Sequence, residues 1–348
     1  MKNNSTYIIG EIGQNHNGSL DIAKKLIKVA AKDVKDSLFN LKLANINAVK
    51  FTKRDLNEEL SDSQMQRPYT SSNSFGKTYG EHRKYLELSN EEHFECYKYA
   101  KQYNLDFIET LCSINCLTIL KLFTPDKLKI ASRDLTNIPL VNALAETKIP
   151  LIISTGMSGK SELDEAIEVI TKYHDYISIL HCVSEYPTNP NNVNLNTILY
   201  LKEKFPQYTI GFSDHTIGIS APIAAVAMGS KIIEKHITLD REMKGTDHIG
   251  SLGPDGIYRL IRDIRLLEKS FGKKDIFIDP STFISKVKLE RSIASNKELN
   301  KGTIIKKEDL HLLSPGDGLK WNEKNKIIGK TVNEKILKNE IIYLKNLE

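Results

Sequence analysis

The chain has 348 residues, and its 40% hydrophobic and 27% charged content is ordinary for a globular protein. This composition excludes a disordered, collagen-like or coiled-coil chain. The formal net charge of +5 arises in residues 285–348, where 14 Lys and Arg stand against 9 Asp and Glu. These cations are dispersed among acids and no Arg cluster or interleaved aromatic residues accompany them, so we expect no nucleic-acid partner.

Neither the N-terminal segment nor any later stretch has the pattern of a targeting or membrane segment. The start has no long apolar core and no small-residue cleavage site. Nothing later reaches the about 18 continuous apolar residues of a membrane helix. Four scattered cysteines, Cys96, Cys112, Cys116 and Cys182, are too few for a disulfide framework, and the Cys112/Cys116 pair lacks the second pair of a zinc site. We expect buried thiols in a cytoplasmic protein without a membrane partner.

Eight short apolar runs rich in Ile and Val predict strands, and helical periodicity separates most of them. Alternating strands and helices predict a parallel sheet with right-handed crossovers. Eight such units in about 270 residues favour a closed (β/α)₈ TIM barrel over an open doubly wound sheet. The predicted strands are residues 7–11, 48–51, 107–110, 128–131, 151–155, 177–182, 209–213 and 231–237. The predicted helices are residues 21–34, 91–104, 161–174, 195–205, 220–228 and 254–271.

The helical pattern stops near residue 272, and a smaller domain is predicted after it. We assign residues 1–272 to the barrel, 273–285 to a linker and 286–348 to a small β-rich domain with Asn-Lys-Gly and Pro-Gly-Asp-Gly turns. A domain of roughly 60 residues is marginal alone, so we expect it to dock on the barrel or on a partner subunit. Residues 34–43 are predicted to be an insertion without an assigned function.

Polar side chains recur where the predicted strands end. In a TIM barrel these carboxyl ends meet at one face, which is where barrel enzymes place their chemistry. A single polar residue at a strand end is ordinary loop solvation, but so many at one mouth indicate a site. The residues concerned are Glu11, Lys50, Thr110, Lys129, Ser132, Ser154, Ser213, His215, Glu234 and His236.

The residue types at this mouth suggest a small phosphorylated anion and a metal. Lysines supply point charges and hydroxyls supply donors for phosphate oxygens. His215 and His236 could hold a divalent metal with open positions, and Mn, Fe or Zn would all fit such ligands. Glu11 is the acid–base candidate, because a carboxylate that ends a buried strand should have a raised pKa.

Seven motifs fall on or near the predicted strand ends, and in this order they resemble the sialic acid (N-acetylneuraminate) synthases along nearly the whole chain. The tail, with Asn-Lys-Gly-Thr-Ile-Ile and Ser-Pro-Gly-Asp-Gly, resembles the C-terminal antifreeze-like (SAF, β-clip) domain of that family. The seven motifs are Glu-Ile-Gly-Gln-Asn-His-Asn-Gly (11–18), Val-Lys-Phe (49–51), Ser-Thr-Gly-Met (154–157), His-Cys-Val-Ser-Glu-Tyr-Pro (181–187), Gly-Phe-Ser-Asp-His-Thr (211–216), Glu-Lys-His-Ile-Thr (234–238) and Lys-Gly-Thr-Asp-His (244–248).

The resemblance implies condensation of phosphoenolpyruvate with N-acetylmannosamine or a related hexose, with or without a 6-phosphate, to a nine-carbon 2-keto sugar acid and phosphate. It implies a divalent metal at His215 and His236, Mn²⁺ with Mg²⁺ or Co²⁺ as alternatives, that polarises the sugar aldehyde, while Glu11 assists addition of water. It also implies a domain-swapped homodimer in which the tail of one subunit caps the barrel of the other. Positions that match phosphoenolpyruvate contacts are Lys50, Thr110, Lys129, Ser132, Ser154 and Ser213, and those that match sugar contacts are Tyr186 and Asp247.

Three departures from the family pattern concern the acceptor side of the site. Thr52 stands where the family usually has Gln, Arg133 where it has Gly, and Ser314 where many bacterial members have Arg. Residues 68–82 resemble animal members, which use a 6-phosphorylated acceptor. Arg133 would then meet a phosphate, and the alternative is a surface ion pair with Asp134.

Other functions stay open on the sequence alone. The acceptor could be a 2,4-diacetamido-trideoxy hexose, as in legionaminate or pseudaminate synthases. The chain could also be a metal-dependent barrel aldolase, a deoxy-heptulosonate-type synthase, or a non-catalytic carbohydrate- or ice-binding homologue. The joint presence of Glu11, Lys50, His215 and His236 argues against a pure binding protein, because binding alone needs no metal at the barrel mouth.

Overall fold

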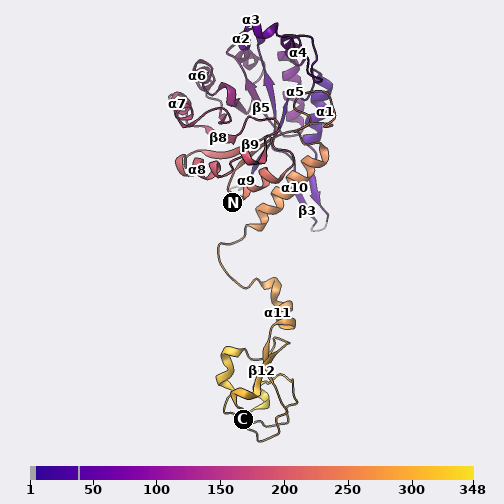
Figure 1. The fold of residues 1–348 in the computed structure, drawn as a ribbon, viewed down its shortest axis with the longest axis vertical. Coiled ribbons are helices and arrows are strands. Elements are labelled where there is room, and N and C mark those ends of the chain that lie inside the picture. The colour runs from indigo at the N-terminus through magenta and orange to yellow at the C-terminus, as the bar shows by residue number, and fades with distance from the viewer. Residues whose placement is uncertain (1–4, 38–39) are drawn as a thin grey trace. The chain divides into compact units, whose positions relative to one another are not determined.

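The computed structural model describes residues 5–37 and 40–348, which form two compact units (Figure 1). The first unit is Met1–Phe271 and the second is Gly272–Glu348. No helix in the described part of the chain is long and apolar enough to cross a membrane.

The first unit is a closed barrel of eight parallel strands, as the sequence predicts. Each strand pairs with the next along the chain, and β10 pairs with β1 to close the ring. The strands are β1 (Tyr7–Gly13), β4 (Ala48–Lys53), β5 (Asp106–Leu111), β6 (Lys127–Ile130), β7 (Leu151–Ser154), β8 (Ile177–Cys182), β9 (Thr209–Asp214) and β10 (Ile232–His236).

An apolar floor closes the inside of the barrel below the mouth. It is formed by Ile9, Ala48, Ile108, Ile152, Leu180 and Ile232, which pack together as a cluster separate from the main core. Because side chains alternate between the two faces of a strand, the residue two positions after each floor residue also points into the barrel. Those next residues are Glu11, Lys50, Thr110, Ser154, Cys182 and Glu234.

Helices surround the barrel and bury their apolar faces against the outward side chains of the strands. Local capping sets where several of them begin: a capping box formed by Ser89 and Glu92 starts α5, and Pro254 occupies the first turn of α10. The main helices are α1 (Leu20–Ala30), α5 (Asn90–Gln102), α6 (Ile138–Glu146), α7 (Lys160–Thr171), α8 (Asn196–Lys204), α9 (Ser220–Ala227) and α10 (Pro254–Ser270).

Two features of the barrel differ from the sequence predictions. The first helix ends at Ala30, and Val34–Asp36 (β2) instead pairs antiparallel with Leu41–Ala44 (β3). The predicted insertion 34–43 therefore contains β2 and most of β3, and its residues 38 and 39 lie outside the described part. Helix α6 had no counterpart among the predicted helices, and it carries a proline near its start with Asn137 as the cap.

A long excursion between β4 and α5 carries short helices that the sequence pattern did not predict. These are α2 (Leu56–Glu59), α3 (Asp62–Met65) and α4 (Tyr79–Tyr85). Each begins at a side-chain cap, Asp55, Ser61 and Thr78 respectively. The excursion contributes to the barrel mouth, because Tyr79 and Arg83 of α4 line the cavity described below.

The second unit has a small core of its own. The first regular elements of the second unit are the 3₁₀ turn Pro280–Thr282 and helix α11 (Phe283–Leu289). Strand β11 (Ser292–Ser295) then pairs antiparallel with β12 (Leu310–Leu313). The remaining strand-like contacts are isolated bridges. The core residues are Ile293, Leu299, Ile305, Leu310, Ile327, Val332, Ile336, Ile342 and Leu347.

Candidate active site

A cavity of about 440 Å³ lies at the carboxyl ends of the barrel strands. Parallel strands bring their carboxyl ends to one face, and the two-residue alternation aims the polar side chains inward above the apolar floor. Every residue predicted from the sequence to belong to the site lines this cavity: Glu11, Lys50, Thr110, Lys129, Ser132, Ser154, Tyr186, Ser213, His215, His236 and Asp247.

Lys50 is the centre of a buried charge cluster. Its ammonium lies 2.7 Å from a carboxylate oxygen of Glu11 on the neighbouring strand and 3.8 Å from one of Glu234. It also donates to the Thr110 hydroxyl at 3.2 Å. All of these side chains are buried, so their interactions are screened far less than surface pairs are.

The two carboxyl groups of this cluster differ in proton affinity. Burial raises the pKa of Glu11 to about 7, although the Lys50 ammonium opposes the effect. Burial would also raise the pKa of Glu234, but Lys50, Lys129 and the Ser213 hydroxyl, which donates to Glu234 at 2.9 Å, lower it to about 2. Glu11 is closer to Lys50 yet holds its proton more tightly, because the charge of Glu234 raises the pKa of Glu11, whereas the Ser213 hydroxyl helps to lower that of Glu234. One carboxyl group that exchanges its proton near neutrality therefore lies beside one that stays ionised.

Gly13 makes room for this arrangement. Its φ of +52° lies in the left-handed region that favours glycine, and a Cβ at this position would lie 2.9 Å from a Glu11 carboxylate oxygen. The β1 strand is irregular here, since the pairing with β4 shifts register between Glu11 and Gly13. This irregularity ends β1 directly beside the Glu11 carboxyl group.

A second buried cation, Lys129, links β6 to β7. Lys129 donates to the Ser154 hydroxyl at 2.6 Å and to the carbonyl of Ile130 at 3.1 Å. Burial lowers the pKa of Lys129, and nearby Lys50 lowers it further. The Ser132 hydroxyl, just beyond the end of β6, accepts from the backbone N–H of Gly156 at 2.9 Å. Two ammonium groups and several hydroxyls thus converge in one buried space.

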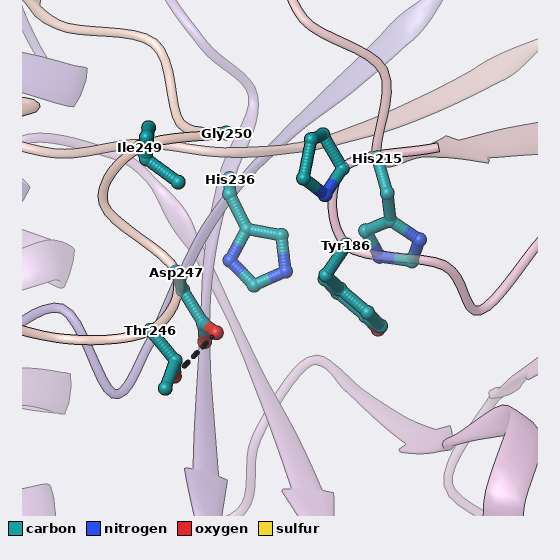
Figure 2. A pocket seen from close by; sticks show the side chains of 8 residues that line it. Tyr186, His215, His236, Thr246, Asp247, Ile249 and Gly250 are labelled. Atoms are coloured by element: carbon teal, nitrogen blue, oxygen red, sulfur yellow. Dashed lines mark hydrogen bonds between the residues drawn. The ribbon is translucent and has the colours of Figure 1, made fainter. Parts of the chain in front are cut away.

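Two imidazoles, those of His215 and His236, lie near each other at the mouth (Figure 2). The ring centroids of His215 and His236 lie 5.5 Å apart, and the Tyr186 ring packs against His215 at 4.0 Å. The Nδ1 of His215 lies 2.9 Å from the Val183 carbonyl oxygen. The hydroxyl of Thr246 donates to Asp247 at 2.9 Å on the loop beyond β10, as Figure 2 shows.

The two histidines can supply some, but not all, of the ligands of a divalent transition metal. Hydrogen bonding of His215 Nδ1 to a carbonyl leaves Nε2 free to coordinate, as is usual for metal-ligating histidines. His236 Nδ1 is buried and has no hydrogen-bond partner within residues 5–37 and 40–348. No group of three or more His, Cys, Asp or Glu in those ranges is arranged as a metal site. A metal here would have two protein ligands, and water and substrate would complete its coordination.

Several residues that line the cavity were not predicted from the sequence to belong to the site. Cys182 points inward above Leu180, where strand alternation alone could have placed it. Arg54 and Arg83 also line the cavity. Arg54 follows a predicted strand end closely enough to have been suspected, whereas Arg83 lies on α4, whose position no sequence pattern indicates.

The chain is similar to known proteins along its whole length. Residues 40–276 match the model of the NeuB family, and residues 290–348 match that of the SAF domain. The human N-acetylneuraminate-9-phosphate synthase is 34% identical over 299 residues, which cover 86% of this chain and 80% of that protein.

Two bacterial proteins show comparable similarity. The N,N'-diacetyllegionaminic acid synthase of Legionella pneumophila is 35% identical over 94% of this chain and 90% of its own length. A crystal structure of N-acetylneuraminic acid (sialic acid) synthetase from Leptospira borgpetersenii superposes with a TM-score of 0.66 at 31% identity, over 82% of this chain and 93% of that one.

Proposed function

Because the chain belongs to the NeuB family and carries a SAF domain, we propose that it is a nonulosonic acid synthase that joins phosphoenolpyruvate to a hexosamine aldehyde. The observation that carries the proposal is the composition of one cavity, which is lined by two buried lysines, their hydroxyl partners and two histidines. Its relatives include an N-acetylneuraminate-9-phosphate synthase and an N,N'-diacetyllegionaminic acid synthase, which agrees with this reaction class.

Phosphoenolpyruvate would bind on the lysine side. Lys50 and Lys129 supply positive charge in a buried space, where attraction for a phosphate and a carboxylate is strong. Hydroxyl groups then orient the anion by donating to its oxygens. The hydroxyls of Thr110, Ser132 and Ser154 line the cavity and accept from protein donors, so their O–H groups are available to the anion, whereas that of Ser213 donates to Glu234.

In the proposed reaction, C3 of phosphoenolpyruvate forms a bond with the aldehyde carbon, whose oxygen takes up a proton. Water adds to C2, and one of its protons goes to a base. The C2–O bond to phosphate then breaks, the new C2 hydroxyl gives its proton to the departing phosphate, and the 2-keto acid remains. Glu11 is the proposed base, since a pKa of about 7 allows it to accept a proton near neutrality. Glu234 stays ionised and would stabilise positive charge that develops at C2.

The acceptor aldehyde would lie on the histidine side. His215 and His236 would hold Mn²⁺, with Mg²⁺ or Co²⁺ as alternatives, and such an ion supplies Lewis-acid polarisation of the aldehyde oxygen. Tyr186 and Asp247 border the same part of the cavity and would orient the sugar. We propose N-acetylmannosamine, with or without a 6-phosphate, as the acceptor.

One alternative has support from a particular observation, and a second does not. The similarity to a diacetyllegionaminic acid synthase favours a 2,4-diacetamido-trideoxy hexose as the acceptor. A non-catalytic carbohydrate-binding homologue would also keep the fold, but it would not need the Lys50–Glu11–Glu234 cluster. We further propose a cytoplasmic, domain-swapped homodimer.

Phosphate release from phosphoenolpyruvate tests the proposal. The protein is supplied with Mn²⁺ and, in separate reactions, N-acetylmannosamine, its 6-phosphate, mannose 6-phosphate or a 2,4-diacetamido-trideoxy hexose. We expect release with at least one acceptor, dependent on that acceptor and abolished by EDTA. Folded, Mn²⁺-loaded protein that releases phosphate with none of them would refute the proposed function.

A further inference from the structure

A buried ion pair links β9 to β10 directly beside the two histidines. Asp214 and Lys235 are register partners in the barrel sheet, and the Lys235 ammonium lies 2.5 Å from an Asp214 carboxylate oxygen. Both side chains are almost completely buried, at no more than 1% exposure. In the sequence, Asp214 directly precedes His215 and Lys235 directly precedes His236. Each member of the ion pair is therefore the chain neighbour of one proposed metal ligand.

The ion pair points away from the cavity. On β10, Glu234 and His236 line the cavity, so Lys235 between them points to the outer face of the barrel. The same alternation directs Asp214 outward on β9. From that face the two side chains can affect the site only through the residues that they hold in place.

The ion pair also closes the turn that carries His215. The Oδ1 of Asp214 accepts from the backbone N–H of Thr216 at 2.9 Å, and its Oδ2 accepts from the Thr216 hydroxyl at 3.1 Å. The Lys235 ammonium donates to the Thr216 carbonyl oxygen as well. The residues on both sides of His215 are thus bonded to Lys235, the chain neighbour of His236.

These contacts extend the connection between β9 and β10 past the end of their backbone pairing, which stops at the ion pair. His236 is still held by its pairing with β1, but His215 lies one residue beyond the end of β9. Hydrogen bonds of His215 with Val183 and Thr188 hold it to the segment after β8. The lysine of the ion pair connects the turn of His215 to β10.

Stability alone does not account for a buried ion pair at this position. Burial removes the hydration of both ions, so apolar side chains of similar volume would stabilise the barrel equally well. Charge-assisted hydrogen bonds do, however, fix the groups that they join in one geometry. A metal site needs such precision, because its ligand distances tolerate deviations of only about 0.2 Å.

We infer that Asp214, Thr216 and Lys235 are positioning residues that fix the separation of His215 and His236, and thereby the affinity of the site for a divalent metal. This inference rests on the proposed function, in which that histidine pair holds Mn²⁺. Loss of the network would free the turn of His215 to move relative to β10. The two lysines of the cavity lie on β4 and β6 and would keep their places.

The Mn²⁺ affinity of folded variants tests the inference without turnover. Titrations followed by the paramagnetic signal of free Mn²⁺ compare the wild type, Lys235→Met and the double variant Asp214→Asn/Lys235→Met. The double variant leaves no unpaired buried charge, and its new amide oxygen can still accept from the Thr216 N–H. Urea unfolding measures the stability of each variant.

Two comparisons separate positioning from stability. Arg265→Met removes another buried cation of the barrel, which donates to the Thr6 carbonyl at 2.8 Å, just before the start of β1. Lys235→Met is also made in His215→Ala, in which the histidine pair no longer exists. Two residues that act through the same contact have effects that do not add.

We expect Lys235→Met and the double variant to raise the Kd for Mn²⁺ about tenfold or more, although the double variant unfolds near the wild-type urea concentration. The Mn²⁺ concentration for half-maximal phosphate release should rise by a similar factor, and KM for phosphoenolpyruvate should change by less than about twofold. Arg265→Met should lower the urea midpoint without changing Mn²⁺ affinity. In His215→Ala, Lys235→Met should change that affinity by less than about twofold.

Wild-type Mn²⁺ affinity in the folded double variant would overturn the inference, because the ion pair would then serve stability alone. The same conclusion would follow if Arg265→Met weakened Mn²⁺ binding as much as Lys235→Met, or if the effect of Lys235→Met persisted in full in His215→Ala. Absence of Mn²⁺ binding by the wild type would refute the metal site and the inference together. Failure to release phosphate with any acceptor, beside the expected Mn²⁺ affinities, would refute the proposed reaction and leave the positioning role standing.

Discussion

Each polar side chain in the cavity owes its direction to strand alternation. Ile9, Ala48 and Ile232 point into the barrel as its floor, so Glu11, Lys50 and Glu234, two positions later, must point into it as well. That relation is readable in the sequence, and it explains why strand-end polar residues could be predicted as one site. The difference in pKa between Glu11 and Glu234 could not be predicted, because it depends on contacts between separate strands.

Replacement of Glu11 by Gln should lower kcat much more than it changes KM. The amide keeps the size and one hydrogen-bond acceptor for Lys50 but removes the proton acceptor. We expect kcat to fall by about 10²- to 10⁴-fold while KM for phosphoenolpyruvate changes by less than about tenfold. Steady-state phosphate release measures both, with the exposed Glu203→Gln on α8 as control. Near-normal kcat in Glu11→Gln would exclude Glu11 as the base.

The role of His215 and His236 as metal ligands can be tested by measuring Mn²⁺ binding, without any enzymatic assay. His236→Ala or His215→Ala removes one of two protein ligands, so Mn²⁺ affinity should fall at least about tenfold. The loss of the paramagnetic signal of free Mn²⁺ on titration measures this affinity. His311→Ala, in the second unit, is the control. Unchanged Mn²⁺ binding in both active-site variants would mean that the metal binds elsewhere.

Helices and strands show where sequence periodicity succeeds and where it fails. The eight barrel strands are buried Ile- and Val-rich runs, and all were predicted. Helix α6 was missed, and so was the β2–β3 hairpin, where the helix predicted to reach residue 34 ends at Ala30. Arg83 could not be assigned to the cavity, because α4 lies in an excursion whose short helices depend on caps rather than on periodicity.

Asp309 makes the stability of the second unit depend on pH. Its carboxylate is buried, accepts from the Lys306 backbone N–H at 3.0 Å and lies 2.6 Å from the Lys297 ammonium. Burial opposes ionisation, but the contacts with Lys297 and Lys306 outweigh it and lower the pKa of Asp309. The stabilisation is therefore fully present above the unfolded pKa of about 3.9 and is lost as pH falls through the lower folded value.

Trp321, the one tryptophan in the chain, reports on this unit because it lies in its 3₁₀ turn Trp321–Lys326. We expect the urea midpoint of the Trp321 fluorescence transition to fall between about pH 5 and pH 3 in the wild type. In Asp309→Asn the midpoint should be lower at pH 7 and vary less over that range. Glu298→Gln, which removes an exposed ion pair with Lys335, is the control. Parallel pH profiles of Asp309→Asn and the wild type would rule out this role for Asp309.

At the scale of the whole molecule, the order of strands and helices was sufficient to predict a barrel followed by a small β-rich domain. The second unit exposes large apolar side chains near its start, including Ile276, Phe283, Ile284 and Leu289. Exposed apolar surface of this kind is typical of a contact surface. Sequence periodicity cannot reveal such a surface, because it depends on which side chains remain uncovered after the unit has folded.

The proposed homodimer predicts a mass in solution of twice the 39.4 kDa of one chain. Light scattering coupled to size exclusion measures it at micromolar concentration. Ile284→Asp, at a side chain that is 80% exposed, should weaken the dimer without unfolding either unit. Lys301→Asp is a control at an exposed polar position. A monomer at all concentrations would contradict the proposed dimer and leave the reaction class untouched.

In the proposed reaction, a carbon–carbon bond forms in this cavity between phosphoenolpyruvate and a sugar aldehyde. The most direct measurement is mass spectrometry of the product made from phosphoenolpyruvate labelled with ¹³C at all three carbons, together with the yield of phosphate. We expect a nine-carbon 2-keto acid that contains the three labelled carbons, with one phosphate released for each product molecule. Labelled pyruvate and phosphate beside an unchanged sugar would show hydrolysis without condensation, and would rule out the proposed reaction.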